Sequence, residues 1–199
     1  MNYAFTNGKI LNGTKDMQIQ EGLCILVQEG KITDIVPDTT DLHDYKIIDL
    51  HGHYILPGLI NMHVHLAGSG KPQKKQRDNE KLVNTIMGSS LIRAVAYNMV
   101  AGFARDELLS GVTTIRTVGG LGDFDTRLRD EIKAGKKTGP RILAANQGIS
   151  VPGGHMAGSV AIAAATTADA LKHLEKSKKE NVDLIKLMIT GGVLDAKEK

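Results

Sequence analysis

Residues 56–66 have the sequence Leu-Pro-Gly-Leu-Ile-Asn-Met-His-Val-His-Leu, in which a Pro-Gly turn precedes an apolar stretch that carries two histidines. The stretch from Leu59 to Leu66 predicts a buried β-strand, because it is rich in aliphatic residues and bounded by a turn. His63 and His65 would share one face of that strand, since side chains alternate along it. Two adjacent imidazoles are costly as packing but suit a metal chelate. The alternative is a pair of core histidines satisfied by neighbouring groups.

The chain after Pro57 alternates between strand and helix patterns. Three further strands are predicted at residues 112–118, 141–145 and 182–189, and helices at 79–109, 125–134 and 167–179. This alternation favours a parallel sheet covered by helices. Four such units make half of a (β/α)₈ barrel, a fold that typically needs about 250 residues. The pattern therefore stops halfway through a barrel.

The first 57 residues contain strand patterns only. The candidates are residues 3–6, 9–11, 22–28, 31–36 and 46–50, and they are separated by hairpin-type turns such as Asn7-Gly8 and Glu29-Gly30. Helical periodicity begins only after residue 73. The N-terminal part is therefore expected to be a small β domain.

Four segments resemble the amidohydrolase superfamily, the metal-dependent hydrolases that include imidazolonepropionase and prolidase-like dipeptidases. They are residues 55–66, 111–120, 139–142 leading to 153–155, and 183–193. The last segment resembles Xaa-Pro dipeptidases and arginine-type carboxypeptidases. The resemblance implies an α/β fold in which residues 1–57 form the N-terminal part of a small composite β-sandwich. Residues 58–199 would be the first four β/α units of a TIM-type barrel, which is incomplete here.

Composition excludes several other classes of protein. The formal net charge of +3 is too small and too evenly spread to favour nucleic acid, and no apolar run approaches the length of a membrane span. The single cysteine, Cys24, cannot form an internal disulfide, and the N-terminus shows no signal-peptide pattern. We expect a cytoplasmic protein with a small-molecule or peptide substrate, able to form a homo-oligomer.

Four side chains are expected to meet at one rim of the barrel. Catalytic groups of barrels lie at the C-terminal ends of the strands. His63 and His65 fall at the end of the first strand, His155 in the glycine-rich loop after the third, and Lys186 late in the fourth. The resemblance implies that His155 faces the substrate, whereas a loop histidine bonded to backbone is the alternative.

Lys186 interrupts an apolar strand pattern, where a bare ammonium group would be costly to bury. It could lie at a sheet end and extend its amine to water. The resemblance implies instead that its amine reacts with CO₂ to form a carbamate that bridges two divalent cations. Under that interpretation the metal ligands of this chain are His63, His65 and Lys186.

The remaining histidines are expected to be uninvolved. His51 and His53 form a second His-x-His pair, but they precede the Pro-Gly turn and match a linker strand, so we expect them to be structural or exposed. His43 and His173 have charged neighbours and are expected at the surface. Thr117 stands where an aspartate is common in the family, so a supporting carboxylate is not expected there.

The resemblance implies hydrolysis of an amide or peptide C–N bond by a metal-bound hydroxide, with two ions of Zn²⁺ or a similar metal in a complete enzyme. The substrate would be a dipeptide or an N-acyl amino acid, with a cyclic amide of the imidazolonepropionase type as the alternative. The strand-eight aspartate that would act as general acid and base is absent, as are two histidine ligands. The chain alone would then be an inactive fragment, a truncated product or one half of a split enzyme.

Overall fold

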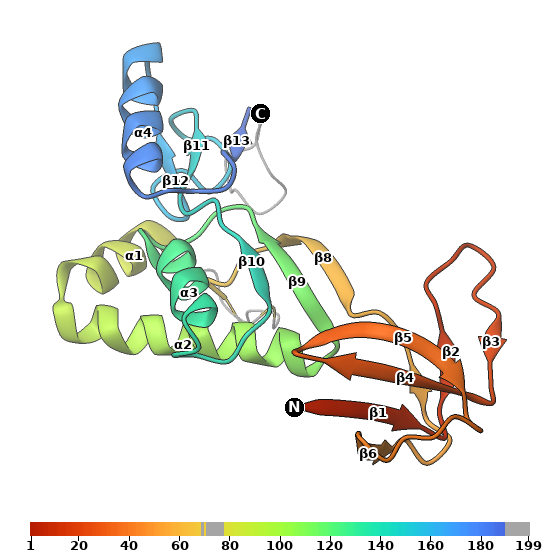
Figure 1. Ribbon diagram of the computed structural model, residues 1–199. Coiled ribbons are helices and arrows are strands. Elements are labelled where there is room, and N and C mark those ends of the chain that lie inside the picture. Colours follow the sequence, from red (N-terminus) through yellow and green to blue (C-terminus); the bar gives the residue numbers. More distant parts are fainter. Residues whose placement is uncertain (69, 71–77, 190–199) are drawn as a thin grey trace. The chain divides into compact units, whose positions relative to one another are not determined.

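The computed structural model describes residues 1–68, 70 and 78–189, and the chain forms two compact units, Met1–Pro57 and Gly58–Lys199 (Figure 1). The architecture is mixed α/β. The assignment of the units to a sandwich and a half-barrel stays a prediction. No helix among the described residues is long and apolar enough to cross a membrane.

The first unit contains two small sheets. Its strands are β1 (Asn2–Thr6), β2 (Lys9–Leu11), β3 (Ile19–Gln20), β4 (Leu23–Gln28), β5 (Lys31–Pro37), β6 (Lys46–Asp49) and β7 (Tyr54–Ile55). The sheets have the orders β5-β4-β1-β6 and β3-β2-β7. Glu29 and Gly30 both have positive φ, as a two-residue hairpin between β4 and β5 requires. The two-residue strands β3 and β7 are too short to show alternation, and the sequence does not predict them.

The second unit begins with three parallel strands in the order β10-β9-β8. They are β8 (Leu59–Val64), β9 (Val112–Thr117) and β10 (Arg141–Leu143). Helix α2 (Ser90–Leu109) packs on β9, and α3 (Phe124–Lys133) packs on β10, as Figure 1 shows. Ile115, Phe124, Leu128 and Ile142 are buried in the core between sheet and helices. This arrangement places the C-terminal ends of β8 and β9 side by side.

A second parallel sheet has the order β12-β11-β13. Its strands are β11 (Gly148–Ser150), β12 (Ala161–Ala163) and β13 (Leu187–Met188), and α4 (Thr167–Lys179) follows β12. The predicted fourth strand at 182–189 is wrong in length, because only two of its residues pair as a strand. Asp183 is instead held by Arg129 of α3 at 2.8 Å and by the backbone N–H of Ala144 at 2.8 Å.

The predicted helix at 79–109 is two helices, α1 (Asn79–Gly88) and α2. Ser89 lies between them in an extended conformation, and its side chain accepts a hydrogen bond from the backbone N–H of Ile92. Serine is a favoured N-cap because its oxygen satisfies an otherwise unpaired N–H. Hydrophobic periodicity continues across the break, so the pattern alone did not reveal it.

Strand β8 is not buried on both faces as predicted. Ile60 is 63% exposed and Met62 is 44% exposed, whereas Val64 is buried. Leu143 of β10 and Leu187 of β13 are also exposed apolar strand residues. The helices cover one face of the β10-β9-β8 sheet, and the apolar side chains of the other face remain exposed among the described residues.

Candidate functional site

His63 and His65 lie at the C-terminal end of β8. Their ring centroids are 5.3 Å apart, and the ring planes are inclined by 59°. His63 is exposed and His65 is half-buried. The pairing of β8 with β9 shifts register between Asn61 and Val64, so the backbone is irregular where it carries the histidines. The two imidazoles are therefore neighbours at a strand end whose backbone is not held by regular hydrogen bonding between β8 and β9.

Side chains compensate for this irregularity. The Arg116 Nε on β9 donates to the carbonyl oxygen of Met62 at 2.8 Å, and the Asn61 side-chain oxygen accepts from the backbone N–H of His63 at 3.2 Å. A backbone carbonyl that loses its ladder partner needs another donor. Arg116 supplies one and thereby fixes the strand immediately before His63.

The His65 ring is oriented by the turn that follows β9. Its Nδ1 lies 3.0 Å from the carbonyl oxygen of Gly119. Nδ1 must therefore donate, which leaves Nε2 as the lone-pair nitrogen of the neutral ring. Gly119 has φ +135°, and a Cβ there would lie 3.2 Å from the imidazole. The turn thus approaches His65 closely only because residue 119 is a glycine.

The electrostatic surroundings of His65 show which side chains lie near it. Burial lowers the pKa of the His65 imidazole most strongly, and the hydrogen bond to Gly119 opposes this effect. Positive charge on His63, Lys186 and His155 lowers that pKa further. The structure therefore brings His63, Lys186 and His155 within electrostatic reach of His65. A neutral imidazole is the form that binds a metal ion.

Lys186 immediately precedes β13 rather than lying within a strand, and it is half-buried rather than fully buried. Lys186 therefore does not lie late within the fourth strand as predicted, because that strand is shorter than predicted. The Lys186 carbonyl accepts from the backbone N–H of Ile149 at 2.9 Å, and its stem packs against Gly148 of β11. His155 is half-buried in the connection between β11 and β12. Residues 190–193, the end of the segment that resembles dipeptidases, lie outside the described residues.

The other histidines lie in different surroundings. His51 is within 3.3 Å of the Asp49 carboxylate, and the Nδ1 of His53 is 2.7 Å from the carbonyl oxygen of Leu50; both rings are exposed. His43 is exposed. The prediction for His173 is wrong, because this side chain is only 6% exposed and lies 3.1 Å from the carbonyl oxygen of Gln147. Its charged neighbours in sequence lie on other faces of α4.

Sequence reasoning missed a buried polar group beneath this site. Asp125, in the first turn of α3, is 1% exposed, and the Thr117 side chain and the Asn146 backbone lie near enough to lower its pKa. A carboxyl group therefore does stand beside Thr117, supplied by α3 rather than by β9. Aspartate in a first helical turn is usually a surface residue that favours the helix dipole, so the sequence carried no sign of its burial.

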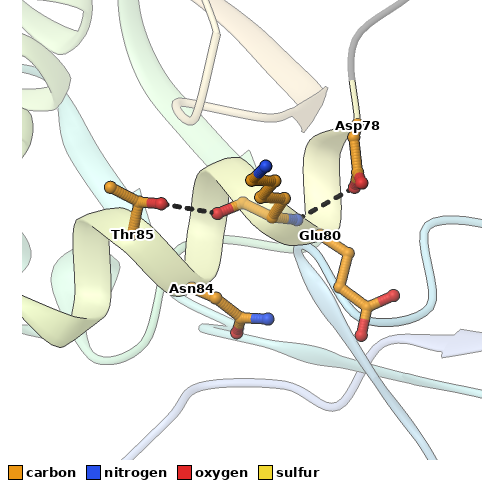
Figure 2. Close-up of a pocket in the computed structure, with 5 residues that line it drawn as sticks. Asp78, Glu80, Asn84 and Thr85 are labelled. Carbon is orange, nitrogen blue, oxygen red and sulfur yellow. Dashed lines mark hydrogen bonds between the residues drawn. The ribbon is translucent and has the colours of Figure 1, made fainter.

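The described part of the chain contains no cluster of three or more His, Cys, Asp or Glu side chains that could hold a metal ion. A hollow of about 440 Å³ lies at the start of α1, and Figure 2 shows its lining residues. Asp78 accepts there from the backbone N–H of Lys81, and Thr85 donates to the Lys81 carbonyl. These polar groups serve the helix start, and none of the candidate ligands lines the hollow.

Comparison with known proteins decides the family. The sequence model of the amidohydrolase family matches residues 54–198. This chain belongs to the amidohydrolase family. Its structure is similar to a putative prolidase from Bifidobacterium longum, with 32% identity, a TM-score of 0.74, and coverage of 99% of this chain and 43% of that one. It is also similar to a Xaa-Pro dipeptidase with bound methionine in the active site, with 29% identity, a TM-score of 0.75, and coverage of 98% and 48%.

Among curated proteins, the amidohydrolase chain matches a dihydroorotase from Bacillus cytotoxicus at 34% identity over 99 residues, which is 48% of this chain and 21% of that protein. A dihydroorotase from Bacillus cereus matches at 33% over 95 residues, again 21% of its length. The chain therefore spans under half the length of the solved relatives described, and its matched part spans about a fifth of these curated relatives.

Proposed function

We propose that this chain supplies the first metal ligands of a metal-dependent amidohydrolase that cleaves the C–N bond of a dipeptide or an N-acyl amino acid. The observation that supports this most is the arrangement of His63 and His65. They are adjacent at a strand end, and the Nδ1 of His65 is held by Gly119. The similarity to a Xaa-Pro dipeptidase supports the choice of substrate.

The donor set suits a divalent metal such as Zn²⁺. Two neutral imidazoles are common zinc ligands, and a ligating histidine usually donates its other N–H to a carbonyl or carboxylate, as His65 does to Gly119. His63, His65 and Lys186 would hold the metal. When bound, such ions activate water and polarise the scissile carbonyl.

Lys186 would contribute as a carbamate. The Lys186 ammonium group first loses one proton. Its neutral amine then attacks CO₂, a C–N bond forms as one C–O π bond of CO₂ opens, and a second proton is released, so that the cationic side chain becomes an anion with two oxygens. His155 would contact the substrate from the connection between β11 and β12.

The proposed site needs groups from outside residues 1–199. Two histidines and Lys186 leave coordination positions open, and open coordination gives weaker zinc binding than a closed site. The exposed apolar face that includes Ile60, Met62 and Leu143 also needs a covering partner. We therefore expect these residues alone to associate and to hydrolyse nothing until a complementary half is present.

Two alternatives to this function remain open to test. The chain could be a non-catalytic product that never acquires the missing groups. The similarity to dihydroorotases over 48% of the chain supports a cyclic amide as the second candidate substrate.

Zinc binding tests the proposed ligands directly. Equilibrium dialysis of residues 1–199 against Zn²⁺ should show weak binding that is lost in His65→Ala and retained in His53→Ala. Lys186→Ala should abolish any strengthening of zinc binding by added bicarbonate, whereas Lys176→Ala, a matched exposed lysine, should not. Equal zinc affinity in wild type and His65→Ala would refute the assignment.

Activity tests the substrate. Residues 1–199 should be combined with the C-terminal half of the Bifidobacterium longum prolidase and assayed with Xaa-Pro dipeptides, N-acyl amino acids and dihydroorotate. Turnover of a dipeptide or an N-acyl amino acid supports the proposal. Hydrolysis of dihydroorotate alone would replace it with the cyclic-amide function.

A further inference from the structure

Asp125 is the most unusual polar side chain in the described part of the molecule. It is 1% exposed, and its Oδ2 has no hydrogen-bond partner among the described residues. An unpaired buried carboxylate oxygen costs free energy that a well-packed apolar side chain would not. A favourable interaction with the dipole of α3 does not require such burial, because a surface carboxylate gains the same interaction.

The carboxyl group lies beneath the loops that follow two strands. The Thr117 side chain at the end of β9 and the Asn146 backbone after β10 lie near enough to this carboxyl group to lower its pKa. A Cβ built on Gly120 would lie 2.5 Å from Oδ2, so the hydrogen at that position points at the unpaired oxygen. The backbone N–H of Gly120 also donates to the Asn146 carbonyl at 2.8 Å.

Gly119, the residue before Gly120, faces His65, the candidate metal ligand. The Gly119 carbonyl accepts from the Nδ1 of His65, and a Cβ at Gly119 would lie 3.2 Å from that ring. Two consecutive glycines therefore lie between the His65 imidazole on one side and the Asp125 carboxyl on the other. If the Asp125 carboxyl moved this turn, the hydrogen bond between Gly119 and His65 would change as well.

We propose that Asp125 is a positioning residue for His65, because its buried carboxyl supports the Gly119–Gly120 turn whose carbonyl selects the His65 tautomer. The proposal rests on the proposed function only in taking His65 as a metal ligand. Asp125 itself touches neither metal nor substrate.

The turn requires a carboxyl oxygen rather than an amide at this position. Oδ2 can accept a weak contact from the Gly120 Cα–H, whereas an amide nitrogen would direct N–H groups at it. Burial raises the pKa of Asp125 to about 6, against the opposing hydrogen bonds from Thr117 and Asn146. The group is therefore mostly an anion at neutral pH, so neither oxygen carries a proton and each is able to accept.

Asp125→Asn is the direct test, since it preserves the shape and one oxygen of the side chain. Nitrogen-15 NMR of the histidine-labelled chain, without metal, reports which nitrogen of neutral His65 carries the proton. In the wild type we expect the proton on Nδ1. In Asp125→Asn we expect a mixture of tautomers and an apparent Zn²⁺ affinity lowered about tenfold, the smaller effect seen when the partner of a ligating histidine is lost.

Asp130→Asn is the matched control, because it makes the same change on an exposed carboxylate of the same helix. It should leave the His65 tautomer unchanged. A single Nδ1–H tautomer in a folded Asp125→Asn would overturn the proposal. If Asp125→Asn does not fold, Thr117→Val and Thr117→Ser decide: only Val, which lacks the hydroxyl, should shift the tautomer, and no shift in either overturns it.

The tautomer measurement is independent of catalysis. If Asp125→Asn shifts the His65 tautomer while His65→Ala leaves zinc binding unchanged, the positioning role is upheld and the proposed function is refuted. If Asp125→Asn leaves the tautomer unchanged while His65→Ala abolishes zinc binding, the proposed function is upheld and the positioning role is refuted.

Discussion

The chain contains two His-x-His pairs with the same spacing and different surroundings. His51 and His53 lie in the turn between β6 and β7, where their rings are exposed and contact an aspartate and a carbonyl of their own turn. His63 and His65 lie at the end of a parallel strand, and His65 is held by Gly119, 54 residues away. Spacing alone therefore does not distinguish the two pairs.

The two pairs differ in the side chains and backbone groups that contact their rings. The rings of the first pair are exposed and contact only groups of their own turn, the Asp49 carboxylate and the Leu50 carbonyl. Beneath the second pair is the Gly119–Gly120 turn, supported by the buried side chains of Thr117, Asp125 and Asn146. Fixed imidazoles lose less conformational entropy when a metal binds, because that entropy was already lost on folding.

The largest expected effect separates the two pairs by activity. In the enzyme reconstituted with a complementary half, His63→Ala should abolish hydrolysis, because it removes a proposed metal ligand. His53→Ala should retain most of it, because that ring bonds only to its own turn. The measurement is kcat/KM for whichever substrate the reconstituted enzyme cleaves.

Parallel zinc analysis of both variants identifies the cause. Only His63→Ala should lose metal, with unchanged circular dichroism in each. Equal losses of activity from the two substitutions would remove the distinction between the pairs.

The sequence predicted the position of the pair but not its support. The Pro-Gly turn and alternating strand pattern placed His63 and His65 on a strand end, and strand β8 is there. The contact of Arg116 with Met62 joins residues that are far apart in the chain. The contact of Asp125 with Gly120 buries a residue that its position in the first turn of a helix would place at the surface. Periodicity carries no information on such contacts, because it describes only which face a residue occupies.

The failed predictions have a related cause. The helix break at Ser89 depends on one side-chain cap, and the shortening of the fourth strand depends on contacts of Asp183 with Arg129 and Ala144. The burial of β8 was overestimated because its apolar residues resemble those of a strand that is covered on both faces. Local composition indicates what an element can bury, and only tertiary contacts decide what it does bury.

A second prediction compares the carboxylates near the two pairs through the pH dependence of stability. Burial raises the pKa of Asp125 from 3.8 to about 6. The folded state then holds a proton that the unfolded state has released, so this group lowers stability as the pH rises from about 4 to 6. A shift of this size corresponds to about 3 kcal/mol, at about 1.4 kcal/mol for each pKa unit.

We expect urea unfolding to show that Asp125→Asn gains about 2 kcal/mol relative to the wild type between pH 4 and pH 7, because the unfolded carboxyl group is already partly ionised at pH 4. The comparison of two pH values in each protein cancels the contributions of all other carboxylates. Unfolding free energies that change in parallel with pH in the two proteins would show that Asp125 does not titrate as its burial requires.

The smallest expected effect belongs to Asp49, the carboxylate beside the first pair. Its pKa is lowered by hydrogen bonds from the His51 backbone and the Asn7 side chain, an effect opposite in sign to that on Asp125. Asp49 therefore adds stability at neutral pH, and this is lost only as the pH falls below the usual value of 3.8. Because the group is exposed, water and salt screen the interaction, so Asp49→Asn should match the wild type in urea unfolding at pH 7.

The Asp49→Asn substitution should also leave zinc binding unchanged. A loss of zinc binding in Asp49→Asn would show that the first pair is a second metal site, and the contrast between a supported and an unsupported pair would then fail.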